Sequence, residues 1–301
     1  MKTVLCICTY RRPEGLALLL DSLRLLDTTD EFEVVVVDND AKGEGLAVCH
    51  SLADNYPYPL HALSALEPGI SPARNSAASK ALELAPDFIA FLDDDEWPEQ
   101  NWLKELIRVL TSSNADVVGG PTVSVFPAGQ LPAGQEYYGA DLGLPDGAMC
   151  QLQAAGNFLI RRQTLTTLGP QFFDPDFAHS GGEDLAFFTQ LSQQGAKMNW
   201  AANAIVHESV PDSRLSHAWL RRRVVNIHNS RVRVMQRLNP GTGASLIRAS
   251  KTVALFIASM LVSLAGLFSP SLKQRGQLLR WKFVGKFTAH IGRVTVRGET
   301  Y

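Results

Sequence analysis

The chain has 301 residues, of which 46% are hydrophobic and 19% charged, and this composition predicts a globular protein with a substantial buried core. The first apolar run spans only about five residues and is followed by two arginines, so a cleaved signal peptide and export are not expected. The four cysteines form no Cys-x-x-Cys pair and have no histidine at zinc spacing. This argues against a disulfide scaffold or a zinc site and predicts reduced thiols in the cytosol.

The net charge of −2 conceals an uneven distribution of charge along the chain. Residues 1–212 hold 12 Lys and Arg against 29 Asp and Glu, whereas residues 213–301 hold 16 Lys and Arg and one acid, Glu299. We therefore expect two parts, a folded part over 1–212 and a basic tail over 213–301. Such a tail favours an anionic partner: nucleic acid, lipid head groups or a phosphate-bearing substrate. Nucleic acid is disfavoured because the tail has no basic motif interleaved with aromatic residues.

Along residues 1–212, short apolar runs alternate with segments of helical periodicity. The runs at 4–8, 34–37 and 88–92 predict strands, and the segments at 13–26 and 71–84 predict helices, with another helix beginning at Pro98. This alternation predicts a parallel sheet covered on both faces. The polar residues after the strands then meet at one edge of the sheet, where such folds bind ligands; they are Thr9, Tyr10, Asp38, Asp40 and Asp93 to Asp95. A Gly/Pro-rich stretch at 127–147 predicts a long functional loop.

The three adjacent aspartates, Asp93 to Asp95, need a positive partner, because unpaired carboxylates repel one another and are costly to bury. Capping of a following helix accounts for one or two of them. A calcium loop is rejected, because Pro98 and Lys104 stand where such a loop needs Gly and a bidentate Glu. The first strand is followed by neither Gly-x-Gly-x-x-Gly nor Gly-x-x-x-x-Gly-Lys, so backbone amides are not expected to hold phosphates. A divalent cation is the expected partner.

Six motifs follow one another along the chain: CICTYRRPEGL, VVVVDND, GISPARNSAASKAL, FLDDDEWP, AGNFLIRR and GGEDLAFFTQL. In this order and spacing, residues 2–212 resemble the inverting nucleotide-sugar glycosyltransferases of family 2. CTYRRP, VVVVDND and VHESVPDSRLS are similar to the succinoglycan-type glucosyltransferase subgroup of exopolysaccharide assembly. The resemblance implies the GT-A fold, an α/β fold with a Rossmann-like, mostly parallel mixed sheet flanked by helices. It also implies transfer of a sugar from a nucleotide-sugar donor, by analogy UDP-glucose, to a saccharide or lipid-linked acceptor.

The resemblance further implies a metal-assisted donor site at the triple aspartate. Asp95 would hold Mn²⁺ or Mg²⁺, and Asp93 would meet the ion or the ribose. Asp94 would belong to the donor site without a defined role. His207 would be a further metal or phosphate contact, although a single histidine after an apolar run is also typical of a structural residue.

The nucleotide is expected to lie against the ends of the first two strands and a following helix. By the same resemblance, Thr9 and Tyr10 would line the base pocket and Asp38 would accept from the base. Arg11 would belong to the nucleotide-sugar site, and Arg74 would reach the base or the phosphates. Two alternatives remain open: Asp38 caps a turn, and Arg74 pairs with a surface carboxylate.

An inverting transfer requires a base that takes the proton of the acceptor hydroxyl as it attacks the anomeric carbon. The position of Asp184 in GGEDLAFFTQL implies this role, with Glu183 contacting the acceptor or orienting the site. Alternatively, the two acids only stabilise the first turn of a helix.

Residues 213–301 differ from the polymerising synthases of the same family, because the tail has WLRRR in place of Gln-x-x-Arg-Trp and a single apolar segment at 252–268. Transfer of one sugar is therefore expected. The segment is near the lower length limit for a spanning helix, and basic residues flank both of its ends. We predict a helical tail that associates with the cytoplasmic face of the plasma membrane through a shallow or re-entrant helix. A helical subdomain packed on the first part is the alternative.

Two other classes of function remain open. A nucleotidyltransferase that makes sugar nucleotides uses a similar fold, but it would carry a Gly-rich triphosphate loop near the first strand. A non-catalytic carbohydrate-binding protein would need neither a base nor three aspartates.

Overall fold

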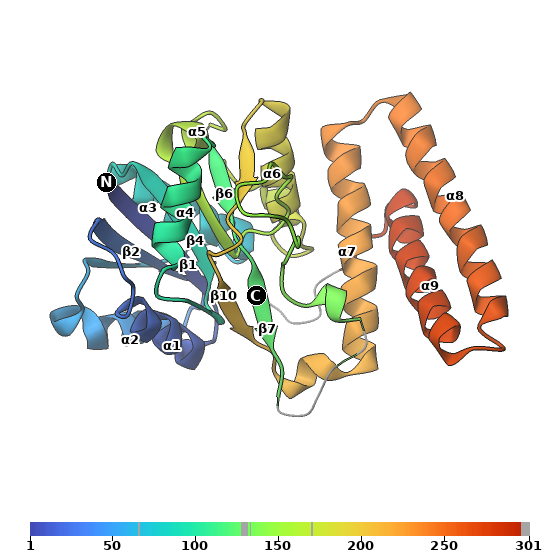
Figure 1. Ribbon diagram of the computed structural model, residues 1–301, viewed down its shortest axis with the longest axis horizontal. Coiled ribbons are helices and arrows are strands. Elements are labelled where there is room, and N and C mark those ends of the chain that lie inside the picture. The colour runs from blue at the N-terminus through green and yellow to red at the C-terminus, as the bar shows by residue number, and fades with distance from the viewer. Residues whose placement is uncertain (66, 128–131, 133, 170, 296–301) are drawn as a thin grey trace.

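The computed structural model describes residues 1–295 apart from 66, 128–131, 133 and 170. Figure 1 shows an α/β part that contains the N-terminus and, beside it, the long helices of the C-terminal part of the chain. The strands are β1 (Lys2–Thr9), β2 (Glu31–Asp38), β3 (Leu60–Ser64), β4 (Phe88–Asp93), β5 (Glu96–Pro98), β6 (Val117–Gly119), β7 (Thr122–Val125), β8 (Asn157–Arg161), β9 (Met198–Trp200) and β10 (Val206–Ser209). The helices are α1 (Pro13–Leu23), α2 (Glu44–Leu52), α3 (Ile70–Glu83), α4 (Trp102–Ser112), α5 (Arg162–Thr166), α6 (Glu183–Gln193), α7 (His217–Leu238), α8 (Thr242–Ala265) and α9 (Pro270–His290).

Seven strands form the main sheet in the order β3-β2-β1-β4-β8-β6-β9. The pairs β3/β2, β2/β1, β1/β4 and β6/β9 are parallel, and only β8 runs against its two neighbours. This confirms the predicted mixed, mostly parallel sheet. In register, Thr9 lies opposite Asp38 and Cys8 lies opposite Asp93, so the carboxyl ends of β2, β1 and β4 meet at one edge.

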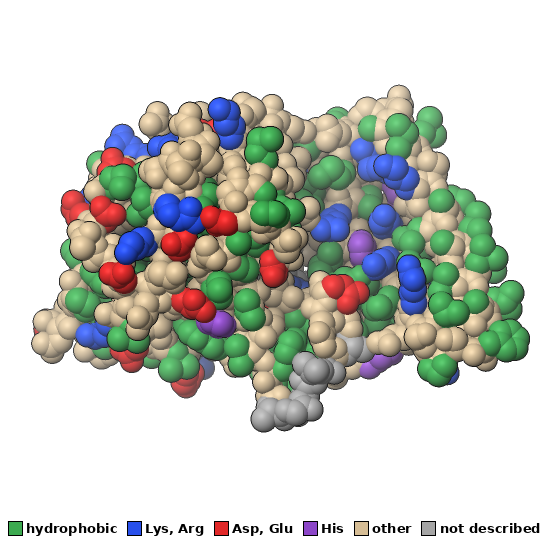
Figure 2. All heavy atoms as spheres, viewed as in Figure 1, with side chains coloured by type: hydrophobic (Ala, Val, Ile, Leu, Met, Phe, Trp, Pro, Cys, Tyr) green, Lys and Arg blue, Asp and Glu red, His purple; other side chains and the backbone are tan. Residues whose placement is uncertain are grey.

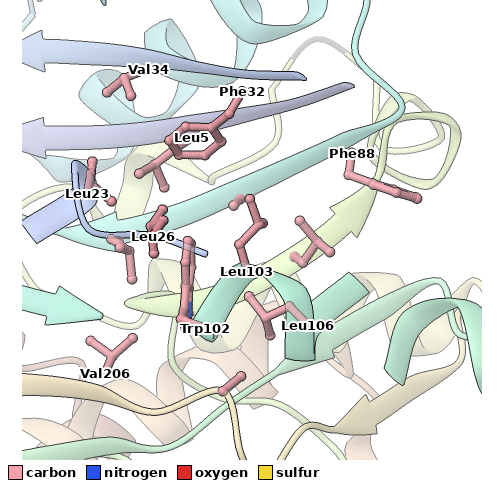
Figure 3. Packing of buried hydrophobic residues seen from close by; sticks show 14 of the residues in the cluster. Leu5, Leu23, Leu26, Phe32, Val34, Phe88, Trp102, Leu103, Leu106 and Val206 are labelled. Carbon is pink, nitrogen blue, oxygen red and sulfur yellow. The ribbon is translucent and has the colours of Figure 1, made fainter. Parts of the chain in front are cut away.

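Helices cover both faces of this sheet, because the central strands are apolar on both sides. One set of strand residues, including Leu5 and Val34, packs against Leu23 of α1 and Trp102 of α4, as Figure 3 shows from close by. The alternate residues of the same strands pack against α3 and α6 on the other face. The period-2 alternation of a strand explains why neighbouring residues belong to two separate clusters.

A second, smaller sheet of β5, β10 and β7 lies beyond the end of β4. It corrects the expected helix start at Pro98: that residue ends β5, and α4 begins at Trp102. The short strand forms because it pairs antiparallel with β10, with Glu96 opposite Glu208. Helix α1 is also shorter than expected and ends at Leu23. All four cysteines are free, as predicted.

Helix α7 packs directly on the α/β part. Its Val234 joins Ala186 of α6 and Phe177, which precedes α6, in one buried cluster, and Trp219 stacks on Tyr138 with ring centroids 4.9 Å apart. Tyr138 follows the short helical turn η2 (Gln135–Tyr137), within the loop expected over 127–147, part of which lies outside the described residues. The basic tail is therefore joined to the first part by a hydrophobic contact as well as by charge.

Helices α8 and α9 form a hairpin on the outer side of α7. Helix α8 is long and apolar enough to cross a membrane by length and composition, with a mean hydropathy of 1.5, yet only 11% of its apolar window is buried. Its exposed side chains include Ile257, Met260, Leu261 and Leu264. In Figure 2 this apolar surface forms the rim farthest from the α/β part. A soluble helix normally buries such a face, so this surface is one for which a partner is expected.

Candidate active site

A cavity of about 240 Å³ opens where β1 and β4 end, between the α/β part and α7. Its walls bring together the triple aspartate, the acids of GGEDLAFFTQL and several arginines. Among the predicted site residues, those that line it are Tyr10, Arg74, Asp93, Asp94, Asp95, Glu183 and Asp184.

Asp94 is the buried member of the triple aspartate. Its carboxylate accepts from the Thr9 hydroxyl at 2.8 Å and from Arg12 Nη1 at 3.0 Å. Burial raises the pKa of Asp94 to about 6, although the Arg12 guanidinium acts in the opposite direction. Asp94 therefore fixes the end of β1 against the end of β4.

Asp95 and Asp93 point into the cavity and are each held by arginine. Asp95 Oδ2 lies 2.9 Å from Arg12 Nη1 and 3.4 Å from Arg214 Nη1, where Arg214 belongs to the turn η4 (Asp212–Leu215). Asp93 Oδ1 lies 2.8 Å from Arg74 Nη2. The positive partner that the three aspartates require is thus supplied, within the chain, by guanidinium groups from three separate segments.

Arg74 connects the two acidic motifs. Its Nη1 donates to Glu183 Oε1 at 2.9 Å while its Nη2 donates to Asp93, and both Arg74 and Glu183 are buried. Glu183 begins α6 directly after Gly182, whose φ of +105° is a backbone conformation that favours glycine. This turn sets Glu183 toward Arg74 and leaves the next residue, Asp184, half-buried at the cavity wall.

Two further acids, Glu96 and Glu208, were not expected from the sequence. Glu96 is buried and accepts from the backbone N–H of Asp93 at 3.0 Å. Burial, and after it the charge of Asp93, raises the pKa of Glu96 well above its usual range. Gly156 makes room for it, since a Cβ there would lie 2.6 Å from Glu96 Oε1. Glu208 accepts from the Ser124 hydroxyl and the Gly139 N–H.

A second cavity, of about 610 Å³, adjoins the first between β7, η2 and α7. The two cavities share wall residues from the loop around Tyr138 and from α7, among them Arg223 and Asn226. Within the described part of the chain, Asp184 is the one Asp or Glu that lines both. Its Oδ1 accepts from the Leu185 N–H at 2.7 Å.

Four predicted site residues lie outside the first cavity. Thr9 supports it through Asp94, whereas Asp38 is buried and accepts from the backbone N–H groups of Asp40 and Leu46. Arg11 stacks over the Tyr10 ring at 4.7 Å and pairs with Asp40 at 3.5 Å. His207 lies on the face of β10 opposite Glu208, 3.2 Å from a Glu99 oxygen and stacked on Trp97.

Four arginines and one tryptophan are further cavity residues to which the sequence reasoning gave no role in the site. Arg12, one residue after the predicted Arg11, enters the cavity, and Arg214, Trp219, Arg222 and Arg223 enter it from the tail. The WLRRR segment was the available signal, because its residues contribute three of these side chains.

The carboxylates fit a divalent cation that is shared with a substrate. Asp93 and Asp95 have side chains that are 41% and 22% exposed, and both face the cavity. Among the described residues, no three His, Cys, Asp or Glu side chains gather into a complete metal site. Mg²⁺ and Mn²⁺ are commonly bound by one or two carboxylates together with substrate phosphates, so two open carboxylates suit such an ion better than an all-protein cage would.

Solved structures show the same fold. The mannosyltransferase PcManGT from Pyrobaculum calidifontis, in complex with GDP-Man and Mn²⁺, superposes with a TM-score of 0.67 at 18% identity, covering 96% of this chain and 86% of that one. S. aureus TarS 1–349 in complex with UDP gives a TM-score of 0.55 at 16% identity, covering 97% and 92%. With an acidic cluster at the strand ends and an acid at the start of α6, the fold is that of a GT-A glycosyltransferase.

Sequence comparison identifies the family. Residues 4–166 match Glycosyl transferase family 2, and residues 88–285 match Glycosyl transferase family group 2. The succinoglycan biosynthesis protein ExoM of Rhizobium meliloti (strain 1021) is 34% identical over 221 residues, which are 72% of this chain and 70% of that protein. The chain belongs to glycosyltransferase family 2 and is related to a transferase of exopolysaccharide biosynthesis. This membership decides against the nucleotidyltransferase and the non-catalytic binding protein.

Proposed function

We propose that this enzyme transfers a single sugar, with inversion, from a UDP-sugar to a saccharide or lipid-linked acceptor of cell-surface polysaccharide assembly. The observation that carries the proposal is the position of Asp184 at the junction of two cavities. A direct displacement needs donor and acceptor on opposite sides of the anomeric carbon, with a base beside the acceptor hydroxyl. Asp184 meets this requirement if the donor occupies the first cavity and the acceptor the second.

The donor site consists of the ends of β1 and β4. Tyr10 lies where it can line the nucleobase, and Arg12, Arg74 and Arg214 give the cavity positive charge for the diphosphate. Asp93 and Asp95 would hold Mn²⁺ or Mg²⁺, which supplies stabilisation of the negative charge that develops on the leaving diphosphate. Asp38 and His207 are bonded within the protein, and these contacts favour structural roles for both.

Asp184 would act as the base through its carboxylate, which takes the proton from the attacking hydroxyl. It lies in the first turn of α6, where N–H groups of the helix start are available to a negative charge and the Leu185 N–H donates to it. Glu183 would act as a positioning residue, since its charge is directed to Arg74 and not to the cavity of the acceptor. UDP-glucose as donor is supported only by the resemblance of the sequence motifs to the succinoglycan-type glucosyltransferase subgroup.

We further propose that the tail holds the enzyme at the cytoplasmic face of the plasma membrane. The exposed apolar residues of α8 and the basic residues around them support a helix that lies in the head-group region. An acceptor with a lipid anchor would then present its sugar to the second cavity.

A panel of nucleotide sugars, assayed for release of free nucleoside diphosphate, tests the activity. For the base, Asp184→Asn keeps the shape and removes the charge, so turnover should fall about 10² to 10⁴-fold while UDP affinity stays nearly unchanged. Near-normal turnover would show that another residue is the base.

For the metal, calorimetry should show that UDP binding is lost in EDTA and in Asp95→Ala. Equal UDP affinity with and without metal would exclude the ion.

A further inference from the structure

Helices α7 and α9 approach one another closely and place basic side chains together. At Gly285 of α9 a Cβ would lie 2.3 Å from the Val225 carbonyl oxygen and 3.0 Å from His228 Cβ, so glycine is needed for the contact. On the same side of α9, one turn apart, are Lys282 and Lys286. Lys282 Nζ lies 5.7 Å from the centroid of the Tyr137 ring, at the wall of the first cavity.

These lysines belong to a basic cluster, which we define as Arg231, Lys251, Lys282 and Lys286 around His228. The pKa of Lys286 is lowered first by burial and then by the positive charges of Arg231, Lys251 and Lys282. The pKa of His228 is lowered to about 3, first by burial and then by the positive charges of Arg231, Lys282 and Lys286. Figure 2 shows blue Lys and Arg side chains and a purple His gathered over the region of α7 and α9. The charged groups that lower these two pKa values are all cations.

In the part of the chain that the structure describes, no acid neutralises this cluster. Residues 213–295 contain no Asp or Glu, and within the described residues no carboxylate lies at ion-pair distance from Arg231, Lys282 or Lys286. Elsewhere on α7 the situation differs, since Arg237 lies 3.4 Å from Asp174 and 3.1 Å from Asp176. Gathering unpaired like charges at a partly buried place costs free energy, which an anionic ligand would recover.

The cluster is connected to the second cavity by Arg231. This residue lines the same cavity as Asp184, and it lies on α7 three residues after His228, on the same side of the helix. On its other side, α9 packs against α8, where Phe256 and Phe283 have ring centroids 4.8 Å apart. A ligand with a sugar at Asp184 would meet the cations next and the apolar surface of α8 after them.

We propose that the basic cluster binds the diphosphate group of a lipid-diphosphate-linked acceptor whose saccharide occupies the second cavity. The inference rests on the proposed function, because it takes that cavity to be the acceptor side. Several cations converge here, and a diphosphate offers more charge and more acceptor oxygens than a phosphate monoester. The cluster would distinguish such an acceptor from a free saccharide.

Farnesyl diphosphate is a suitable probe, since it carries the diphosphate and a short apolar chain and needs no bilayer. Its binding to the full-length protein is measured by calorimetry with saturating UDP and a fixed concentration of Mn²⁺, so that the donor cavity is filled. We expect Lys286→Gln and Lys282→Gln each to weaken binding at least about tenfold, because each removes a charge-assisted bond to phosphate. Lys286→Arg should retain binding. Arg280→Gln is the matched control, because residue 280 lies about 200° around the helix from residue 282.

The outcomes separate this inference from the proposed function. Equal affinity in wild type, Lys286→Gln and Arg280→Gln would overturn the diphosphate site, as would equally tight binding of farnesol. Vesicles containing phosphatidylglycerol test the other source of phosphate: if Lys286→Gln weakens vesicle binding as much as probe binding, the cluster is a general head-group site and the proposal fails. Failure of the wild type to bind UDP would contradict the proposed function, whereas the difference in probe binding between Lys286→Gln and Arg280→Gln would still test the diphosphate site.

Discussion

Replacing Glu183 by Gln tests whether the buried ion pair with Arg74 maintains the site. Glu183 is fully buried and its Oε1 lies 2.9 Å from Arg74 Nη1, while the other arm of Arg74 reaches Asp93 at 2.8 Å. Glutamine keeps the shape and the hydrogen-bond acceptor but removes the charge. Loss of one partner from a buried pair costs about 3–5 kcal/mol, and because Asp93 still faces Arg74 we expect the lower end, about 3 kcal/mol.

Urea unfolding followed by tryptophan fluorescence measures this loss of stability. Asp184→Asn is the matched control, because the adjacent acid is half-buried and its neutralisation should change stability by less than about 1 kcal/mol. The two variants should therefore differ in their effects: Glu183→Gln should lower stability, and Asp184→Asn should lower turnover. A loss for Glu183→Gln no larger than that of the control would refute the reasoning, since Arg74 would then not depend on this carboxylate.

Two further predictions concern the helical part. The pKa of His228 is lowered from 6.5 to about 3, so the folded chain favours its neutral form; the resulting stability is complete above pH 6.5 and is lost as the pH falls toward 3. Between pH 7 and pH 5 the free energy of unfolding, measured with urea, should fall about 2 kcal/mol more in the wild type than in His228→Gln. Equal losses in the two proteins would show that the pKa of His228 is not lowered. On α8, Met260→Asp and Leu264→Asp place charge on exposed apolar positions and should weaken binding to phosphatidylglycerol vesicles without changing UDP affinity. Ser250→Asp is the control, because Ser250 is exposed but polar. Unchanged vesicle binding in all three variants would exclude contact of α8 with the bilayer.

The main sheet was predictable where local sequence determines structure. β1, β2 and β4 lie at the expected apolar runs, because strands buried on both faces need continuous apolar residues. The three-residue strands β5, β6 and β9 gave no such signal. They form only through pairing with distant segments, as β5 does with β10. A sequence pattern within a few residues cannot indicate such a distant partner. For the same reason a helix was expected where β5 lies.

The acids of the site were predictable, but their cationic partners were not. Asp93 to Asp95 stand out because three adjacent carboxylates after a buried apolar run need a positive partner, and Asp184 stands out by its position in GGEDLAFFTQL. Arg11 and Arg12 look equivalent in the sequence. The backbone distinguishes them, because Arg11 has a φ of 55° and pairs with Asp40, whereas Arg12 continues into the cavity. Such a local reversal depends on tertiary contacts that spacing does not report.

The charge difference between the two parts has a physical consequence at the site itself. A basic tail was expected to meet an anionic partner, and one such partner is the acidic part of the same chain: Arg214 reaches Asp95, and Arg237 reaches Asp174 and Asp176. These contacts, with Trp219 stacked on Tyr138, attach α7 beside the cavities. These ion pairs thus neutralise positive charge of η4 and of part of α7, whereas the positive charge of α9 has no acidic partner among the described residues. Charge that folding does not use is available for a ligand, and α9 holds it between the cavity that contains Asp184 and the exposed apolar surface of α8.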